Sequence, residues 1–217
     1  MKSSTIISFL ALALTSDVAF ADEDTNYITC GSAIKLTHVE NNADFFLSSD
    51  NHRMNGSGSG QQLVTSNPDG GSSSSLWIIK ESHGKSPCKT GESIAYGAKI
   101  RLTHVSTGSN LHSHNVRSPL SQQQEVSGYG ENAAGDTGDD WVVQPTRGSA
   151  KYWEKGEFVY LQHAETGVYL GCTTQAQFTQ RNCGHNCPVM DHLEVFGRNS
   201  KDSFTKWKTD VGIFLHK

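Results

Sequence analysis

The hydrophobic positions of this chain come in short alternating runs, which segments rich in glycine, serine and asparagine interrupt. In one run Ile100, Leu102 and His104 point to one side of an extended chain, while Arg101 and Thr103 point to the other. This alternation is typical of a strand that buries one face in a sheet. The polar segments follow at the spacing of an all-β fold, and no stretch keeps a helical period. The pattern therefore predicts a protein built of short strands.

The same landmarks occur three times in the same order. Each copy begins with a leucine and, two positions later, a histidine; it then passes through a turn into a second apolar stretch and ends near a tryptophan. These landmarks are Leu36, His38 and Trp77; Leu102, His104 and Trp141; and Leu161, His163 and Trp207. Such agreement indicates an internal repeat, with units at about 28–80, 94–144 and 156–211.

Three β units of this size can close on one another, so that each supplies a third of a barrel and a third of a cap and no sheet edge stays free. We therefore predict an all-β, pseudo-threefold β-trefoil in a single domain, residues 22–217. An open solenoid is the alternative, although three units without capping sequences suit it less well. We assign the repeated leucines and tryptophans to the core and give them no chemistry.

The first 21 residues have the features of a secretory signal. Lys2 precedes the apolar run 6–14, and small residues at Ala19 and Ala21 predict cleavage after Ala21. The apolar run is shorter than the ~20 residues that span a bilayer, which disfavours a membrane anchor. We expect a protein without membrane insertion, lumenal or secreted. The chain ends in GIFLHK and lacks a KDEL-type retrieval signal.

An oxidising compartment makes disulfides the default for the five cysteines. We expect Cys30 to pair with Cys88 and to close the first unit. In the third unit we favour a bridge from Cys172 to Cys183 or Cys187, and the sequence does not choose between these two. An odd count leaves one thiol unpaired or bonded to another chain.

A zinc site is the alternative interpretation of the cysteines in the third unit. Cys183, Cys187, His185 and His192 are its candidate ligands, but the two cysteines stand four apart and secretory conditions favour oxidation. In the first unit, Asn55 begins a glycosylation sequon, usable only in a secretory compartment.

Charge and motifs exclude several classes of function. The formal net charge of −4 argues against a nucleic-acid-binding protein, which would present a basic face. The chain has no nucleophile elbow, and the acidic pair Asp139-Asp140 lies just before Trp141 in what looks like a turn. We therefore expect no enzyme activity, no cofactor and no bound metal.

Four segments together resemble the MIR domain family, and most closely its stromal cell-derived factor 2 group. They are GSGSGQQ at 56–62, IRLTHVSTGSNLHSH at 100–114, SPLSQQQEVSGYGE at 118–131 and DDWVV at 139–143. The resemblance extends over roughly 28–215; it is strong in the first two units and thin in the third, which carries extra residues between Leu170 and Glu194.

The resemblance implies a β-trefoil in the lumen of the endoplasmic reticulum. It implies protein partners, namely a J-domain co-chaperone, a BiP-type chaperone and unfolded clients, in protein folding and quality control. A second hypothesis is a carbohydrate-binding trefoil that recognises glycans of O-mannosylated secretory proteins, for which Phe45, Phe46 and Tyr169 are candidate stacking residues.

His112 and His114 project to one face of a strand, where they could bind a ligand, respond to pH or simply be solvated. We disfavour a metal there because no further ligand can be named. Glutamines in the first two units suit hydrogen bonding to a peptide backbone or to sugar hydroxyls. The residues predicted to bind a partner or glycan are His112, His114, Arg117, Gln61, Gln62, Gln122, Gln123 and Tyr129.

Overall fold

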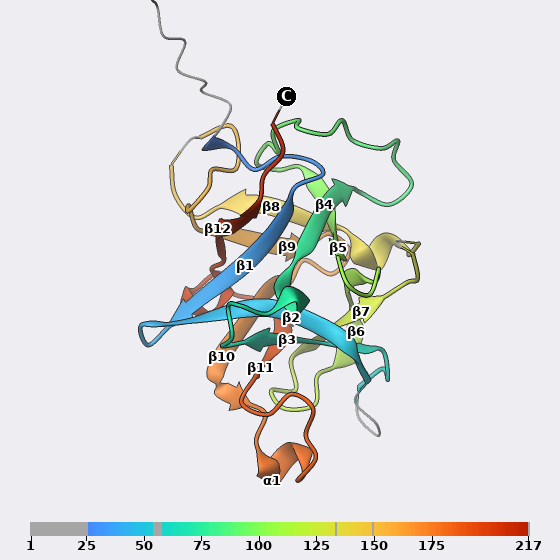
Figure 1. Ribbon diagram of the computed structural model, residues 1–217, viewed down its shortest axis with the longest axis vertical. Coiled ribbons are helices and arrows are strands. Elements are labelled where there is room, and N and C mark those ends of the chain that lie inside the picture. The colour runs from blue at the N-terminus through green and yellow to red at the C-terminus, as the bar shows by residue number, and fades with distance from the viewer. Residues whose placement is uncertain (1–25, 54–57, 133, 149, 217) are drawn as a thin grey trace, which may run out of the picture.

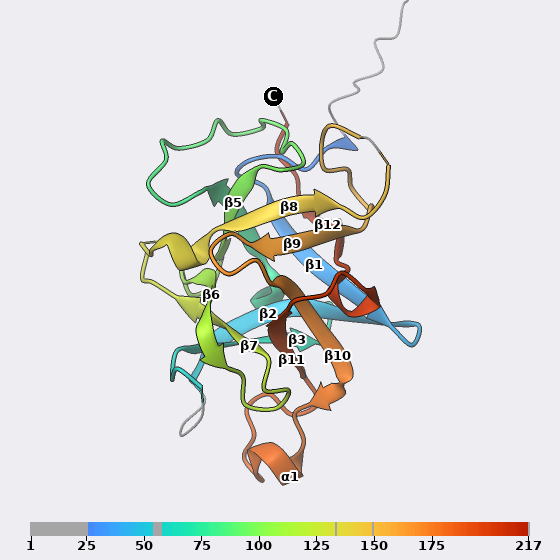
Figure 2. The same ribbon diagram turned by 180° about the vertical axis from the view of Figure 1, so that it is seen from behind.

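The computed structural model describes residues 26–53, 58–132, 134–148 and 150–216. The predicted signal segment and Asn55 lie outside these residues. The described chain forms one 12-stranded sheet (Figures 1 and 2). Its strands are β1 (Ala33–Glu40), β2 (Ala43–Arg53), β3 (Gln62–Asn67), β4 (Trp77–Glu81), β5 (Lys99–His104), β6 (Asn110–Arg117), β7 (Gln124–Tyr129), β8 (Trp141–Pro145), β9 (Val159–His163), β10 (Tyr169–Gln177), β11 (Leu193–Arg198) and β12 (Lys208–Ile213).

Helical segments are short. One turn of 3-10 helix precedes β4, β8 and β12, and a four-residue α-helix, α1 (Gln180–Cys183), lies between β10 and β11. Within the described ranges, no helix is long and apolar enough to cross a membrane. The prediction of an all-β fold is confirmed.

Strand pairing repeats along the chain. Consecutive strands pair as β1–β2–β3, β5–β6–β7 and β9–β10–β11. The next strand then pairs with the start of the following group, as β4–β5, β8–β9 and finally β12–β1. With the pairs β1–β4 and β5–β8 and the bridge between Val159 and Trp207, these contacts close a barrel-like ring. At one end of the ring β3, β7 and β11 pair with one another.

The repeated apolar residues fill the interior of this closed sheet. Leu36, Leu102 and Leu161 are fully buried in the core, as expected from the sequence. The three repeated tryptophans are fully buried as well, and each indole Nε1 donates to a leucine carbonyl oxygen. The pairs are Trp77 to Leu47 at 2.8 Å, Trp141 to Leu111 at 2.9 Å and Trp207 to Leu170 at 2.9 Å.

The repeated histidines connect neighbouring groups of strands. The imidazoles of His104 and His163 lie 4.9 and 5.1 Å, between ring centroids, from the tryptophan of the preceding group, and His38 lies 5.5 Å from Trp207. Each ring also donates a hydrogen bond to a main-chain carbonyl just before that tryptophan. The sequence pattern alone indicated no role for these histidines; in the structure they help to close the ring.

Burial lowers the pKa of all three of these histidines, since desolvation penalises the charged imidazole. In two of them the neutral ring also has complete hydrogen bonding. His104 places Nε2 2.8 Å from the Ser74 carbonyl and Nδ1 2.9 Å from the Thr107 hydroxyl. A neutral imidazole can donate the first bond and accept the second.

The structure confirms one predicted disulfide and contradicts the other. Cys30 is bonded to Cys88, the expected pair. Cys183 is bonded to Cys187, and Cys172 is a free, fully buried thiol. The preference for a bridge from Cys172 was therefore wrong, because Cys172 points into the core from β10 while the other two cysteines lie in the segment beyond it. The same disulfide removes the two thiolates that a zinc site would need.

Candidate functional site

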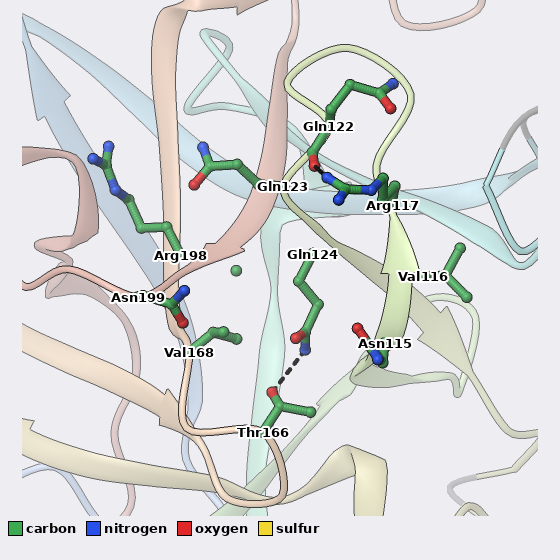
Figure 3. Close-up of a pocket in the computed structure, with 11 residues that line it drawn as sticks. Asn115, Val116, Arg117, Gln122, Gln123, Gln124, Thr166, Val168, Arg198 and Asn199 are labelled. Atoms are coloured by element: carbon green, nitrogen blue, oxygen red, sulfur yellow. Dashed lines mark hydrogen bonds between the residues drawn. The ribbon is translucent and has the colours of Figure 1, made fainter.

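A polar cleft opens on the surface between the second and third groups of strands (Figure 3). Its volume is about 590 Å³. The end of β6, the β6–β7 connection, the β9–β10 turn and the end of β11 line it. The lining residues are Asn115, Val116, Arg117, Gln122, Gln123, Gln124, Thr166, Val168, Gly197, Arg198 and Asn199. We call this the amide cleft.

Local structure sets the shape of the amide cleft. Gln122 has a left-handed backbone, with φ of 60°, which is uncommon outside glycine. Its carbonyl accepts a hydrogen bond of 2.9 Å from Arg117 Nη1, and its amide reaches back to the carbonyls of Ser118 and Pro119 at 3.1 Å each. The rim is therefore held in one conformation before any ligand binds.

Glycine and glutamine keep the floor of the cleft open and ordered. A Cβ atom on Gly197 would collide with a methyl group of Val168, so only glycine fits there. Gln124 Nε2 donates to Thr166 Oγ1 and to Ser113 Oγ, each at 2.8 Å. The first of these bonds connects the second group of strands to the third across the cleft (Figure 3).

The amide cleft is cationic. Arg117 and Arg198 flank it from opposite sides (Figure 3), and no carboxylate is among its described lining residues. Arg198 is oriented by Asp202, with 3.1 Å between Nη2 and Oδ2, and by the Phe204 ring, 5.2 Å from its guanidinium carbon to the ring centroid. Guanidinium groups and amides in one cleft can bind carboxylates together with backbone-like hydrogen-bonding groups.

Two glutamates hold loops of the neighbouring group of strands at this end of the ring. Glu194 in β11 is buried and accepts from the backbone N–H groups of Leu120 at 2.6 Å and Ser121 at 2.8 Å, and from Ser118 Oγ at 3.1 Å. This bonding fixes the β6–β7 connection, which carries one side of the amide cleft.

The glycine-rich loop before β3 is held in the same way. Glu125 in β7 accepts from the Ser59 N–H, with distances of 3.2 and 3.1 Å to its two oxygens, and from His114 Nε2 at 3.0 Å. A Cβ atom on Gly58, whose φ is 66°, would collide with this carboxylate. These contacts make the end of the loop a tight internal connection of the fold.

Leu63 stands in β3 where β7 and β11 have the two glutamates. The loop it faces belongs to the third group and is the long segment between β10 and β11. Phe178 of that segment is buried and lines, together with Leu63 and both glutamates, a small cavity among β3, β7 and β11. An apolar contact therefore replaces the carboxylate and its hydrogen bonds at this position.

Replacing Glu194 with glutamine should destabilise the protein by about 2 kcal/mol. The substitution exchanges an oxygen that accepts backbone N–H bonds for a donor, and a hydrogen bond to a charged group contributes ~1.5–3 kcal/mol. Urea unfolding monitored by tryptophan fluorescence measures the loss. Glu131→Gln, at an exposed position, is the matched control and should stay within about 0.5 kcal/mol of the parent. Equal effects of the two substitutions would contradict this role of Glu194.

The two predicted histidines of β6 do lie together, but they are not both on the surface. Their ring centroids are 5.1 Å apart. His112 is buried, donates from Nδ1 to Asp139 Oδ1 at 2.9 Å and packs on Tyr129 at 4.7 Å. His114 is partly exposed and bound to Glu125. This corrects the expectation of an exposed histidine pair, because the turn before β8 covers His112.

His112 also belongs to a group that could hold a metal ion, together with Asp136 and Asp139. The oxygens of Asp139 are already used within the protein. Oδ1 accepts from His112, and Oδ2 accepts from the side chain of Asn110 and from the backbone N–H of Asp136, both at 3.0 Å. We assign the group to fixing the turn.

The predicted glutamines divide into two sets. Gln122 and Gln123 line the amide cleft with Arg117. Gln62 is buried instead and bonds to Ser49 Oγ at 2.7 Å, so its placement on a recognition surface was wrong. Gln61 accepts from Ser127 Oγ, away from the cleft. Tyr129 is 38% exposed and lies against His112, also outside the cleft lining.

About half of the amide cleft comes from the third group of strands, which the sequence pattern did not predict. Thr166, Val168, Arg198 and Asn199 were not among the predicted residues. The family resemblance is thin there, so no motif marked them. The available signal was the turn Glu165-Thr166-Gly167, which matches Ser106-Thr107-Gly108 of the strongly repeated unit.

The fold and cleft define a class of protein, a closed β scaffold with a polar cleft on its outside. The family model described as the MIR domain matches residues 26–182. The stromal cell-derived factor 2-like protein of Dictyostelium discoideum is 37% identical over an alignment of 219 positions, which covers 99% of each chain. Human stromal cell-derived factor 2 is 40% identical over 190 residues, covering 87% of this chain and 82% of that one.

Solved structures agree with these sequence comparisons. The SDF2-like protein from Arabidopsis thaliana superposes with a TM-score of 0.78 at 37% identity, covering 88% of this chain and 98% of that one. The protein O-mannosyltransferase Pmt1-Pmt2 complex of S. cerevisiae, bound to its sugar donor, gives a TM-score of 0.71 at 26% identity, over 86% of this chain and 26% of that one. The chain belongs to the MIR domain family and, within it, is similar to the stromal cell-derived factor 2 proteins.

Proposed function

We propose that this protein is a pseudo-threefold β-trefoil of the endoplasmic-reticulum lumen that binds polypeptides in protein folding and quality control. Its partners in this proposal are a J-domain co-chaperone, a BiP-type chaperone and unfolded clients. The three repeated sets of strand pairs, each with its buried leucine and tryptophan, support the trefoil. The family membership supports the assignment of partners and compartment.

The observation that carries polypeptide binding is the composition of the amide cleft. Glutamine and asparagine side chains offer both donors and acceptors, which match the N–H and C=O groups of an extended chain. Arg117 and Arg198 add binding of carboxylates at either side. The fixed rim means that little conformational entropy is lost on binding. We infer that acidic segments of polypeptides bind best.

The proposed role is binding without catalysis by the cleft. Its described lining residues include no histidine, cysteine, serine or carboxylate, so a nucleophile and a general base are not brought together there. A stiff scaffold that presents loops fits this role, because scaffold and recognition surface are then separable.

Glycan recognition is the second candidate, and the amides of the cleft are the observation in its favour. Sugar rings usually stack on an aromatic face, and none of the described residues that line the cleft is aromatic. The predicted stacking residue Phe45 is buried. Binding of mannose or galactose ligands on a glycan array, competed by acidic peptide, would favour this candidate over polypeptide binding.

Removing both arginines of the cleft should weaken polypeptide binding at least about tenfold, since each charge-assisted hydrogen bond contributes roughly 1.5–3 kcal/mol. Arg117→Ala/Arg198→Ala is the test variant. Crosslinking in the secretory lumen, followed by mass spectrometry, identifies the partners, and fluorescence anisotropy with an acidic peptide gives the affinity. Arg147→Ala removes an exposed guanidinium elsewhere and should change neither. Unchanged capture of chaperone and client by the double variant would disprove the site.

A further inference from the structure

The segment between β10 and β11 projects from the closed sheet, and its base is held without any covalent bond (Figure 1). The Phe178 N–H donates to the His192 carbonyl at 2.8 Å, and the Asp191 N–H donates to the Phe178 carbonyl at 2.9 Å. Phe178 and Val189 are buried at 1% and 2% exposure. The fold therefore fixes the two ends of the segment by backbone pairing and apolar packing.

The tip of this segment contains a disulfide that crosslinks little of the chain. Cys183, at the end of α1, is bonded to Cys187 across a sequence separation of 4, and both residues are partly exposed. The other disulfide, Cys30–Cys88, spans 58 residues and lies at the core. The stabilisation that a disulfide gives through loop closure grows with loop length, so the fold favours the oxidised form far less at the tip.

The surroundings of the tip disulfide favour attack by a thiol and departure of a thiolate. Arg181 is exposed two residues before Cys183, and Gly184 between the cysteines carries no side chain. A cationic neighbour lowers the pKa of a cysteine thiol and so improves it as a leaving group. Exposure gives an incoming thiol access to the sulfur atoms.

We propose that Cys183–Cys187 is an exchangeable disulfide that oxidises pairs of cysteine thiols in polypeptides. A thiolate of the polypeptide attacks one of the two sulfur atoms, the disulfide breaks, and a mixed disulfide and a protein thiolate form. The second thiolate of the polypeptide then attacks its own sulfur in the mixed disulfide. The polypeptide gains a disulfide, its two electrons pass to the protein, and its two protons end on the thiols of Cys183 and Cys187.

The position of the tip suits a polypeptide bound in the amide cleft, and this part of the proposal rests on the proposed function. Phe178 at the base of the segment and Pro119 of the β6–β7 connection line one small cavity. Both views place α1 at the end of the molecule where that connection turns (Figures 1 and 2). The connection carries Gln122 and Gln123 of the cleft, so one bound chain can contact both places.

The remaining cysteines provide internal references. Cys172 is fully buried, and burial raises the pKa of its thiol, so it should not exchange. Cys30 is 4% exposed and its disulfide belongs to the core. If Cys183 and Cys187 exchange with thiols while Cys172 and Cys30 do not, the exchange occurs in the folded protein and is a property of the tip.

The first experiment measures reduction of the full chain in glutathione buffers, with alkylation of free thiols and mass analysis of each peptide. Cys183–Cys187 should be half reduced at a thiol concentration at least about tenfold lower than Cys30–Cys88 requires. The Cys183→Ser/Cys187→Ser variant should keep the unfolding temperature of the parent, since the base of the segment is held separately. Equal reduction of the two disulfides in the folded protein would overturn the proposal.

The second experiment mixes the oxidised protein with a reduced acidic peptide that carries two cysteines. One equivalent of peptide disulfide should form, and none with the double serine variant. Cys187→Ser, given the same peptide as a disulfide, should form a mixed disulfide through Cys183. Failure of both reactions, with peptide binding intact, would refute exchange and leave the proposed function standing.

The arginine variant tests whether binding in the amide cleft delivers the polypeptide to the Cys183–Cys187 disulfide. Arg117→Ala/Arg198→Ala should oxidise the peptide at least about tenfold more slowly than the parent, in line with its weaker binding. Peptide oxidation at the full parent rate would show that the cleft does not deliver the polypeptide.

Discussion

The free energy of unfolding should fall steeply as the pH drops below 6.5. His38, His104 and His163 are buried, and burial lowers the pKa of each below the ordinary value of 6.5. The unfolded chain therefore binds protons in a pH range where the folded chain does not. The stabilisation is complete above pH 6.5 and is lost as the pH falls towards the folded-state pKa values.

The number of protons that the histidines take up on unfolding limits the slope of the free energy of unfolding against pH. Each histidine contributes at most ~1.4 kcal/mol per pH unit, so three give at most about 4 kcal/mol per pH unit. Burial also lowers the pKa of His192, which adds an effect of the same sign. Urea unfolding at a series of pH values between 7.5 and 5.5 measures the slope.

Substituting single histidines shows which imidazole rings cause the pH dependence of stability. His163→Gln should make the slope shallower by up to about 1.4 kcal/mol per pH unit, because one proton-binding group is removed from the unfolded chain. His83→Gln, at an exposed position, should leave the slope unchanged. A free energy of unfolding that stays constant between pH 7.5 and 5.5 would contradict the lowered pKa values of the buried histidines.

Trp141→Ala should destabilise the protein by about 3–5 kcal/mol, the usual cost of deleting a fully buried aromatic side chain. The substitution removes the packing against His163 and the 2.9 Å hydrogen bond to the Leu111 carbonyl, and it leaves a cavity. Thermal or urea unfolding measures the loss. Trp141→Phe keeps most of the ring and should lose about half as much.

The repeated sequence landmarks make this prediction testable at a second site. Trp77 has the same burial, the same kind of hydrogen bond and a histidine at a similar distance. Trp77→Ala should therefore match Trp141→Ala to within about 1 kcal/mol. Losses that differ by several kcal/mol would show that the repeated pattern hides unequal packing.

The core residues could be predicted from the sequence because their burial follows from the alternation within each strand. An alternating strand buries every second residue, and the repetition of Leu36, Leu102 and Leu161 with their tryptophans marked those positions three times. The roles of His38, His104 and His163 were not found, although they repeat equally well. Their partners belong to the neighbouring group of strands, which a pattern within one unit cannot reveal.

The candidate site was predicted only in part, for a related reason. Arg117, Gln122 and Gln123 lie within one motif of the second unit and were found. Arg198 and Thr166 reach the same cleft only through the strand pairing of β7 with β11 and the turn after β9. Gln62 resembled its counterparts in composition, but the paired strand β7 and the turn between β5 and β6 bury it.

The cysteine pairing in the third unit also depends on three-dimensional placement that sequence spacing does not reveal. Cys172, Cys183 and Cys187 are close in sequence, so spacing alone allowed each pairing. Cys172 lies in β10 with its side chain towards the core, and a bridge would have required the chain to turn back at once. Instead β10 continues to Gln177, which carries the remaining pair out of reach.

The pairing of β12 with β1 has a consequence for biosynthesis. The ring closes only when residues 208–213 lie against residues 33–37, so the two earliest units must wait for the last strand to leave the ribosome. Until then β1 lacks its partner β12 and β9 lacks the bridge from Val159 to Trp207, and these unpaired edges invite contacts between nascent chains. At a typical elongation rate of ~5–20 residues per second, the emerging polypeptide spends roughly 10–35 seconds in this open form. A protein proposed to assist the folding of others thus passes through a vulnerable stage of its own.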